Sequence, residues 1–325
     1  MDSRIYIHRY TLRSKNALNA KTAKNIYHGA LLRVEKAGIC CGYGCIHPWV
    51  ELGDLDLDNT LKQLSEGVLT PLSERALDCA KEDAQARMRN VSIFNGLSVP
   101  ESHATIPMDS WSLYEAVDSG FNLVKLKVGR DLAKEAFFLH QCSARHPDLK
   151  WRLDFNQTQP VEVVRDFLLS LGDFVRAKID FIEDAYLSGS TAFADSDLSV
   201  NTAVDREVAS LEQGYQVKVI KPALSSFDGL LSEARTSGQR AIFTSYMDHP
   251  VGQTYAAWQA ACGYANYPEL RETCGLVTQG LFECDGAEGQ FIEALGEPKP
   301  RFQVPNGSGL GFDDLLEDLS WEKLV

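Results

Sequence analysis

Alternating apolar and polar residues open the chain and then give way to helical spacing. Residues 4–13 and 26–40 alternate in the manner of half-buried strands, and the long polar stretch 14–25 between them predicts a loop. Apolar positions at helical spacing follow, and Pro71 marks the start of one helix because proline is favoured at the first helical position. We therefore expect residues 1–97 to form a small α+β domain.

The pattern changes near residue 102, where short apolar runs begin to alternate with helical segments. These runs are ATIP, LVKLKV, WRLDF, IDFIED, NTAVD, QVKVIK and RAIFTS. Strands that alternate with helices predict a parallel α/β sheet, and seven or eight such units predict a closed barrel. The loop-rich segment that begins at Arg301 is expected to pack back on the first domain.

Polar side chains stand where the apolar runs of the predicted barrel end. They are Lys125, Lys127, Asp154, Glu183, Asp205 and Lys221. The strand ends of a parallel barrel open onto one face, so these six residues are expected to meet there. Side chains two residues apart share a face of a strand. Lys125 therefore accompanies Lys127 toward the barrel interior, and Arg152 and Asn156 accompany Asp154.

The three acids of this set point to a bound divalent cation. Three carboxylates at one place repel one another unless a cation compensates, and oxygen-only ligands select Mg²⁺ or a similar hard ion such as Mn²⁺. An ion that binds a substrate carboxylate makes the α-proton more acidic. A lysine can take that proton only when it is neutral, and the charge of Lys125 favours the neutral form of Lys127. Lys221, on the opposite side, is expected to act as a second base or to set its charge against the enediolate.

Charge and composition argue against several other functions. The 325 residues carry a formal net charge of -13, so a general nucleic-acid binder, which needs a basic face, is not expected. No apolar run approaches the ~18 residues of a membrane span and no signal peptide is visible, so we expect a cytoplasmic protein.

Eight cysteines are scattered along the chain, and only Cys40, Cys41 and Cys45 cluster, close to His47. The cluster lacks a C-x2-C pair and a second ligand pair, so buried or free thiols are expected rather than zinc ligands. With no secretory signal, a disulfide framework is not expected either.

Five motifs, KLK, LDFNQ, FIED, AVDRE and VIKPAL, occur in this order and resemble the enolase superfamily in its muconate-lactonizing-like branch. Within that branch the likeness is to the o-succinylbenzoate synthase family, and it covers nearly the whole chain. The resemblance implies an N-terminal α+β capping domain at 1–97 and a modified TIM barrel, (β/α)7β, at 98–290. It also implies a C-terminal tail at 291–325 that returns to the capping domain.

The resemblance implies a role for each polar residue of the set. Three acids correspond to Mg²⁺ ligands: Asp154, Glu183 and Asp205. Lys127 corresponds to the base that removes the α-proton and Lys125 to its electrostatic neighbour. Lys221 corresponds to the lysine that stabilises the enediolate by its charge. Arg152 and Asn156 are expected to support this site.

The implied reaction uses a small carboxylate substrate and belongs to menaquinone biosynthesis. It is the dehydration of 2-succinyl-6-hydroxy-2,4-cyclohexadiene-1-carboxylate to o-succinylbenzoate, with Lys127 returning its proton to the departing hydroxyl. Thr244 and Ser245 end the seventh strand. They are expected to touch the succinyl group or, alternatively, to bond their own loop.

Other interpretations stay open at this point. The two facing lysines also suit an N-acylamino-acid racemase or a cycloisomerase of the same superfamily. The Asp-x-Asp of dipeptide epimerases is absent from GLVTQGLF, although Glu283 and Asp285 follow nearby. FIEDA replaces an acid-acid-proline ending, and the short segment from Asp205 to Lys221 predicts a trimmed helix. Both departures motivate an alternative of another class, an inactive metal-binding barrel. The 14–25 loop is expected to close over substrate.

Overall fold

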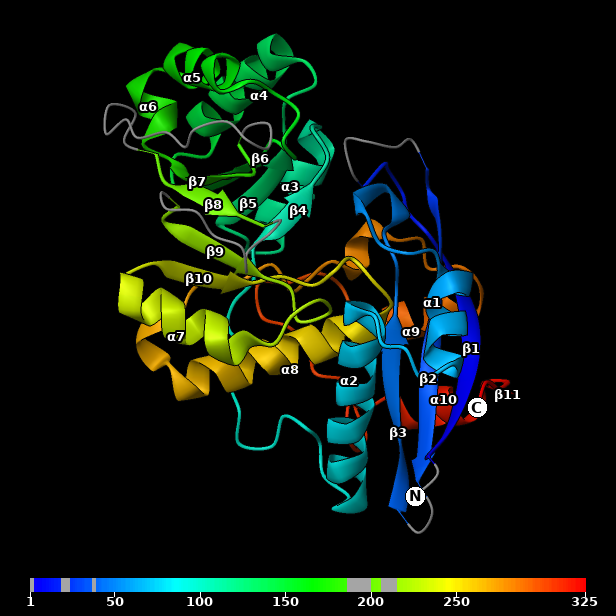
Figure 1. Ribbon diagram of the computed structural model, residues 1–325. Helices are drawn as coiled ribbons and strands as arrows, with labels where there is room; N and C mark the ends of the chain where they lie inside the picture. The colour runs from blue at the N-terminus through cyan, green and yellow to red at the C-terminus, as the bar shows by residue number, and fades with distance from the viewer. Residues whose placement is uncertain (1–2, 19–23, 37–38, 186–199, 206–214) are drawn as a thin grey trace.

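Two bodies lie side by side in the computed structural model, an antiparallel sheet with helices and a curled parallel sheet surrounded by helices (Figure 1). The structure describes residues 3–18, 24–36, 39–185, 200–205 and 215–325. Within these ranges no helix has the length and apolar character needed to cross a bilayer. The seven cysteines whose side chains are described are free thiols.

Four antiparallel strands form the sheet of the smaller body, in the order β11-β1-β2-β3. Their bounds are β1 Ser3–Arg13, β2 Ile26–Lys36, β3 Ile39–Ile46 and β11 Glu322–Lys323. β1 and β2 pair along their whole length, as the alternation in the sequence predicts. The short β11 comes from the end of the chain and adds to the outer edge of β1.

The third strand corrects the expected pattern. The sequence predicts one strand over residues 26–40, whereas β2 ends at Lys36 and a further strand, β3, pairs antiparallel with it. A Cβ on Gly42 or Gly44 would lie 1.9 or 2.1 Å from backbone carbonyl oxygens of α2 (Pro71–Met88). These glycines therefore permit close packing of a strand on a helix, and do not mark a loop.

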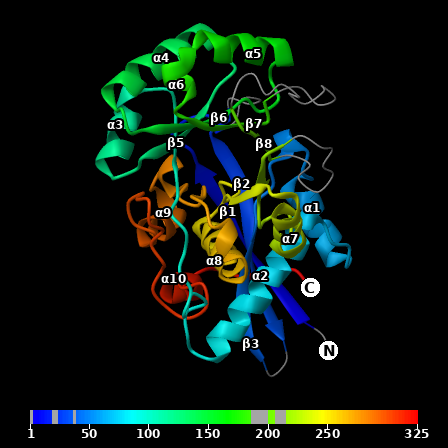
Figure 2. The ribbon, with the colours of Figure 1, turned by 90° about the vertical axis from the view of Figure 1, so that its left-hand side faces the viewer.

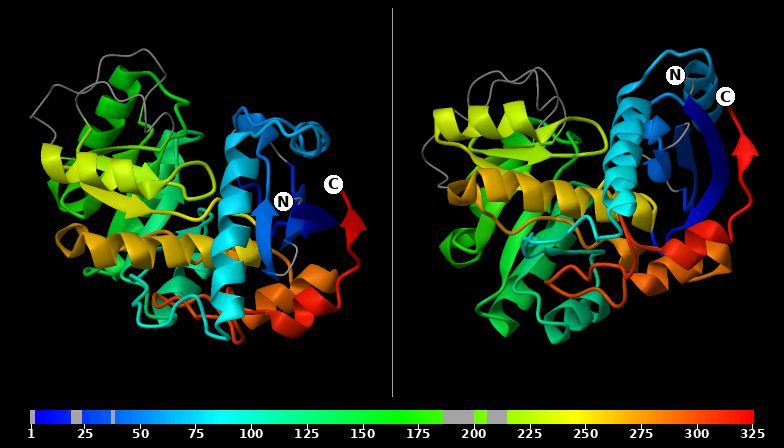
Figure 3. Two further views of the ribbon diagram at one scale, coloured as in Figure 1. Left: turned by 60° about the horizontal axis from the view of Figure 1, so that its bottom comes forward. Right: turned by 90° about the horizontal axis from the view of Figure 1, so that it is seen from below.

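Helices α1 (Leu57–Ser65) and α2 pack on this sheet. α2 begins where the sequence predicts, with Pro71 in its first turn. Thr70 and Ser73 complete a capping box, in which each side chain accepts the other residue's backbone N–H. Figure 3 shows α2 next to α8 (Pro250–Asn266) of the larger body.

Seven parallel strands form the sheet of the larger body, and strands adjacent in sequence are adjacent in space. They are β4 Ala104–Ile106, β5 Leu123–Lys127, β6 Lys150–Asp154, β7 Ile179–Glu183, β8 Thr202–Val204, β9 Val217–Ile220 and β10 Arg240–Phe243. The class expected from the sequence, a modified (β/α)7β barrel with an N-terminal α+β domain, is confirmed.

Helices surround the barrel sheet on its outer face (Figure 2). Those before α8 are α3 Ser110–Asp118, α4 Leu132–Arg145, α5 Val161–Ser170, α6 Gly172–Arg176 and α7 Phe227–Ser237. α9 Gly286–Ala294 and α10 Asp313–Glu317 follow α8 in the chain and lie beside the smaller sheet (Figure 1). Short 3-10 helices lie at Val50–Leu52, Pro268–Leu270 and Gln279–Leu281. The trimmed helix expected between Asp205 and Lys221 falls largely on residues 206–214, outside the described residues.

Residues around Gly275 occupy the position of an eighth strand and form isolated parallel bridges there. Gly275 pairs in parallel with Thr244 at the end of β10, and Cys274 pairs in parallel with Ser102 just before β4. The two edges of the seven-stranded sheet are thus joined through this segment, which closes the barrel. A Cβ on Gly275 would lie 2.7 Å from the His103 ring and 2.9 Å from Thr244 Cγ2, so glycine is required here.

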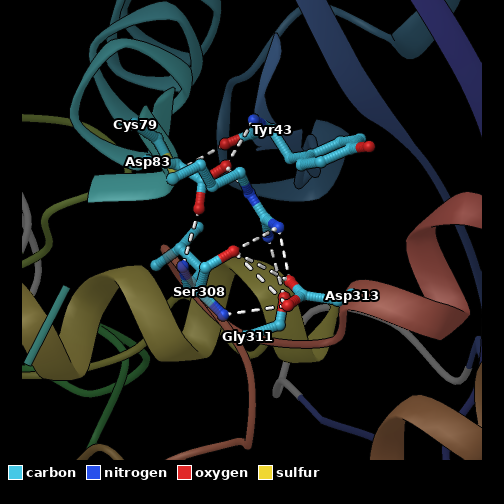
Figure 4. A network of polar contacts seen from close by, with 8 residues as sticks. Tyr43, Cys79, Asp83, Ser308, Gly311 and Asp313 are labelled. Atoms are coloured by element: carbon cyan, nitrogen blue, oxygen red, sulfur yellow. Dashed lines mark hydrogen bonds and ion pairs between the residues drawn. The ribbon is translucent and has the colours of Figure 1, made fainter. Parts of the chain in front are cut away.

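A buried ion network ties the end of the chain to α2 (Figure 4). Asp83 Oδ2 accepts from Arg87 Nε at 2.7 Å and from the Tyr43 N–H at 2.9 Å, and its Oδ1 accepts from the Leu310 N–H at 2.6 Å. Arg87 Nη1 continues to Asp313 Oδ1 at 2.5 Å. Asp83 is fully buried, so its ionised form depends on these partners.

Candidate active site

Five neighbouring barrel strands carry polar residues at their carboxyl ends. Lys127 and Asp154 are register partners at the ends of β5 and β6, and Asp154 and Glu183 are partners at the ends of β6 and β7. Asp205 directly follows β8, and Lys221 directly follows β9. The structure therefore brings the predicted strand-end residues to one mouth of the barrel, with β5 and β9 separated by three strands.

Lys125 lies between two carboxylates. Its Nζ is 3.0 Å from Asp154 Oδ2 and 2.6 Å from Glu183 Oε1. Burial opposes the charge on Lys125, but these acids outweigh it and raise the pKa of Lys125 well above its ordinary value. Although burial also opposes ionisation of Asp154, Lys125 and Lys127 hold the pKa of Asp154 below its ordinary value. Lys125 is thus a fixed cation and not a base.

Lys127, two residues further along β5, has a different environment. Burial lowers the pKa of Lys127 to about 8; Asp154 opposes this shift, and the positive charges of Lys125 and Lys221 add to it. Its Nζ donates a hydrogen bond to the backbone carbonyl of Leu18. A neutral amine is therefore accessible near physiological pH, as a proton-abstracting base requires.

Leu18 belongs to the expected loop 14–25, whose residues 19–23 lie outside the described residues. The stem before it is anchored to the barrel, because the Lys15 N–H donates to Leu281 O at 2.9 Å. Leu18 itself is buried. The first part of the loop thus lies against the barrel mouth, next to Lys127. A backbone carbonyl leaves no signal in the sequence, so this contact was not predicted.

Lys221 lies across the mouth from Lys127. Its Nζ forms an ion pair with Asp205 Oδ2 and stands 5.7 Å from the centre of the Tyr246 ring. Its positive charge is therefore held by one carboxylate and one aromatic face.

The three predicted metal ligands leave two carboxylate oxygens unused. Asp154 Oδ1 accepts from the N–H and Nδ2 of Asn156, at 3.0 and 2.8 Å. Glu183 Oε2 and Asp205 Oδ1 are buried without a hydrogen-bond partner. Burial raises the pKa of Glu183 to about 8, and the charges of Asp154 and Asp205 add to the rise. Unsatisfied buried oxygens in an all-carboxylate set fit a hard cation.

The acids are not yet arranged around one point. Among the described residues, no three acidic, histidine or cysteine side chains are close enough to share an ion as they stand. Each acid of the set is turned toward a lysine: Asp154 and Glu183 toward Lys125, and Asp205 toward Lys221. Ligation of one ion by all three acids therefore requires these side chains to turn until an oxygen of each faces a common point.

Asp184 is a further buried acid at this mouth that the sequence analysis did not assign. Its backbone φ is +45°, and its Oδ1 accepts the backbone N–H of Asp205 at 3.1 Å. Burial raises the pKa of Asp184 to about 7, and the charges of Asp205 and Asp154 act in the same direction. The second acid of FIED was the available signal. Here it accepts a hydrogen bond from the backbone N–H of Asp205.

Arg152 lies deeper in the barrel than the strand-end acids. Its Nε donates to Asp180 Oδ2 at 2.8 Å, and its Nη1 contacts His103 Nδ1 at 2.8 Å and Thr273 O at 2.9 Å. Arg152 thus links β6 to β7 and to the segment that closes the barrel. Asn156, by contrast, bonds Asp154 directly.

The remaining predicted residues follow β10 and the closing segment. Thr244 Oγ1 is buried with no hydrogen-bond partner, whereas Ser245 Oγ contacts Thr278 Oγ1 at 2.7 Å and accepts the Met247 N–H at 3.3 Å. The geometry of Ser245 fits the alternative in which a strand-end hydroxyl bonds its own loop.

The acid pair beyond the closing segment lies at the contact with β1. Glu283 donates its N–H to Arg13 O at 2.8 Å, and Asp285 Oδ2 lies 3.8 Å from Arg13 Nε. Neither acid forms part of the set that ends β5 to β9.

A curated relative decides the family. The o-succinylbenzoate synthase of Bdellovibrio bacteriovorus is 31% identical over 97% of this chain and 97% of its own length. The chain belongs to the o-succinylbenzoate synthase family. The model of that family's N-terminal domain also matches residues 5–86. The resemblance seen in the motifs is thus confirmed, and the protein is an enzyme of this family, not an inactive metal-binding barrel.

Solved structures show the same fold at lower identity. A dipeptide epimerase from Cytophaga hutchinsonii, complexed with Mg and dipeptide D-Ala-L-Val, aligns with a TM-score of 0.76 at 16% identity, covering 99% of both chains. An N-succinyl Arg/Lys racemase from Bacillus cereus aligns with a TM-score of 0.76 at 17% identity, covering 98% of both chains. These likenesses concern the architecture alone.

Proposed function

We propose that this enzyme dehydrates 2-succinyl-6-hydroxy-2,4-cyclohexadiene-1-carboxylate to o-succinylbenzoate and water, a step of menaquinone biosynthesis. Membership of the family supports the reaction. The observation that carries the mechanism is the difference between the two facing lysines. The pKa of Lys127 is lowered to about 8 by burial, whereas Lys221 is paired with Asp205.

The proposed cofactor is Mg²⁺, with Mn²⁺ as a substitute. Asp154, Glu183 and Asp205 would hold it, and the unused oxygens of Glu183 and Asp205 support this assignment. The Mg-containing structure of the dipeptide epimerase with the same fold supports it further. When bound, the ion would draw electron density from the substrate carboxylate and ease loss of the α-proton.

Lys127 would then transfer one proton in two steps, from the substrate carbon to its own amine and from the amine to the leaving hydroxyl. Neutral Lys127 takes the proton from the carbon beside the carboxylate and becomes an ammonium. Lys221, charged and across the mouth, stabilises the negative charge that develops on the substrate. Lys127 returns its proton to the departing hydroxyl, so the C–O bond breaks, water leaves and the ring becomes aromatic. Lys125, which lies beside Asp154 and Glu183, stays protonated throughout.

Turnover of the cyclohexadiene substrate by purified protein with Mg²⁺ tests the proposal directly. Formation of o-succinylbenzoate, its loss with EDTA and its return with added Mg²⁺ are the expected results. Lys127→Ala should lower kcat at least about 10³-fold because it removes the base. Lys150→Ala, which removes an exposed lysine from the start of β6, serves as the matched control and should leave kcat unchanged. A wild-type protein that forms no product contradicts the proposal.

A second candidate is an N-acylamino-acid racemase or cycloisomerase of the same superfamily. It is favoured by the two lysines on opposite sides of the mouth and by the shared fold with the N-succinyl Arg/Lys racemase. Racemisation needs both lysines to exchange protons with the α-carbon. Deuterium exchange at the α-carbon of N-succinylamino acids, with one stereochemical direction lost in Lys221→Ala, would support it.

A further inference from the structure

The aromatic residue beside Lys221 belongs to the loop after β10. Tyr246 is 4% exposed, and its ring centre is 5.7 Å from Lys221 Nζ. Its hydroxyl donates to Asp54 Oδ2 of the capping domain at 2.9 Å. One side chain thus connects the lysine of the barrel to the capping domain.

The capping domain holds Tyr246 at a second point. Trp49 Nε1 donates to the backbone carbonyl of Tyr246 at 2.8 Å, and the Trp49 N–H donates to the same Asp54 Oδ2 at 2.8 Å. Trp49 is fully buried, and its ring packs edge-on against Tyr246 at 6.5 Å. The tyrosine is therefore fixed at its backbone and at its hydroxyl by residues 49–54.

The backbone after Lys221 is also held by the capping domain. Arg75 of α2 donates from Nε to Pro222 O at 3.1 Å, and from Nη2 to Tyr255 OH and Gln259 Oε1 of α8, each at 3.1 Å. These bonds occur where α2 lies next to α8 (Figure 3). The capping domain thus contacts both the loop that carries Lys221 and the loop that carries Tyr246.

The Tyr246 ring can hold the Lys221 ammonium in place where the Asp205 carboxylate alone cannot. Asp205 is a proposed ligand of the ion, so its carboxylate is shared between the ion and Lys221. The electron-rich face of Tyr246 attracts the ammonium without removing its charge or its protons. We propose that Tyr246 is the positioning residue for Lys221, and that Asp54 of the capping domain holds its ring in place. This inference rests on the proposed function, in which Lys221 stabilises charge in the transition state.

A double-mutant cycle in the full-length enzyme tests the coupling. Tyr246→Leu removes the ring and should lower kcat about 10–30-fold with KM changed less than about twofold, because the interaction acts in the transition state. Tyr246→Phe keeps the ring but frees it from Asp54, and a smaller loss of about 3–10-fold is expected. In the Lys221→Ala background neither change should lower kcat further, because the lysine that the ring positions is already absent.

Matched variants separate positioning from general destabilisation. Tyr264→Phe removes another buried tyrosine hydroxyl, which donates to Ala241 O at 2.7 Å and does not contact Lys221. This variant should leave kcat unchanged. Asp54→Asn keeps an oxygen acceptor for Tyr246 and should lose less activity than Asp54→Ala. Circular dichroism and thermal melting verify that each variant is folded.

Two outcomes overturn the inference and differ in meaning. In the first, the losses of kcat from Tyr246→Leu and Lys221→Ala add in the double variant, or Tyr264→Phe loses as much activity as Tyr246→Phe. Either result would show that Tyr246 does not act through the lysine. The proposed function would then stand. A wild-type enzyme that does not form o-succinylbenzoate would remove the proposed function and this inference with it.

Discussion

Two lysines on one strand, two residues apart, have opposite acid–base properties. Lys125 lies between Asp154 and Glu183, which keep it protonated, whereas Lys127 faces the Leu18 carbonyl in a buried position that lowers its pKa to about 8. Lys-x-Lys thus combines a fixed cation and a titratable amine. The difference arises from the partners of each side chain, because the two residues share one face of β5.

The pH dependence of the reaction follows from Lys127. The base must be neutral, and its pKa of about 8 means that kcat/KM should rise roughly tenfold per pH unit below that value and level off above it. Initial rates with saturating Mg²⁺ between about pH 6 and about pH 9.5 measure this. Circular dichroism over the same range controls for unfolding. A profile that falls as the pH rises through 8 would contradict the role of Lys127.

At the scale of elements, one helix shapes the loop that follows the base. Glu135 in the first turn of α4 is buried, and its carboxylate accepts backbone N–H groups of Gly129, Arg130 and Asp131 at 2.8, 2.9 and 3.1 Å. Gln159, from the loop after β6, donates to Gly129 O at 2.7 Å. The two loops are therefore held together at the barrel mouth, immediately beyond Lys127 and Asp154.

Loss of this carboxylate should damage both stability and catalysis. Glu135→Ala leaves three backbone donors without their partner and should lower the free energy of unfolding by about 2–4 kcal/mol. kcat should fall as well, because the loop after Lys127 loses its anchor. Glu162→Ala removes an exposed acid from the first turn of α5 and is the control. Urea unfolding measures the stability of both variants. Equal losses in the free energy of unfolding would refute a special role for Glu135.

At the scale of the whole molecule, α2 contacts both the end of the chain and the barrel. The Asp83–Arg87–Asp313 network of Figure 4 joins the tail to α2. The same helix reaches the barrel through Arg75. The position of the tail is thereby connected, through one rigid helix, to the loop that carries Lys221.

Arg87 is the residue on which the tail contact depends most. Arg87→Met leaves Asp83 buried without its cation and should lower the free energy of unfolding by about 3–5 kcal/mol. Arg89→Met, at an exposed position two residues along, should change it little. Denaturant unfolding measures the difference, and limited proteolysis should show earlier cleavage of the tail in Arg87→Met. Equal stability of the two variants would contradict the importance of the network.

Periodicity and spacing along the chain were sufficient to predict the barrel, its strand ends and the acids and lysines on them. They succeed because a strand alternates its faces locally and parallel strand ends meet at one edge. Tertiary structure alone decided which lysine is neutral and that GYGC is a strand under α2. It also turned Arg152 toward His103 and Asp180, and set Tyr246 between Lys221 and Asp54. Burial and charge partners come from residues distant in sequence, so no local pattern contains them.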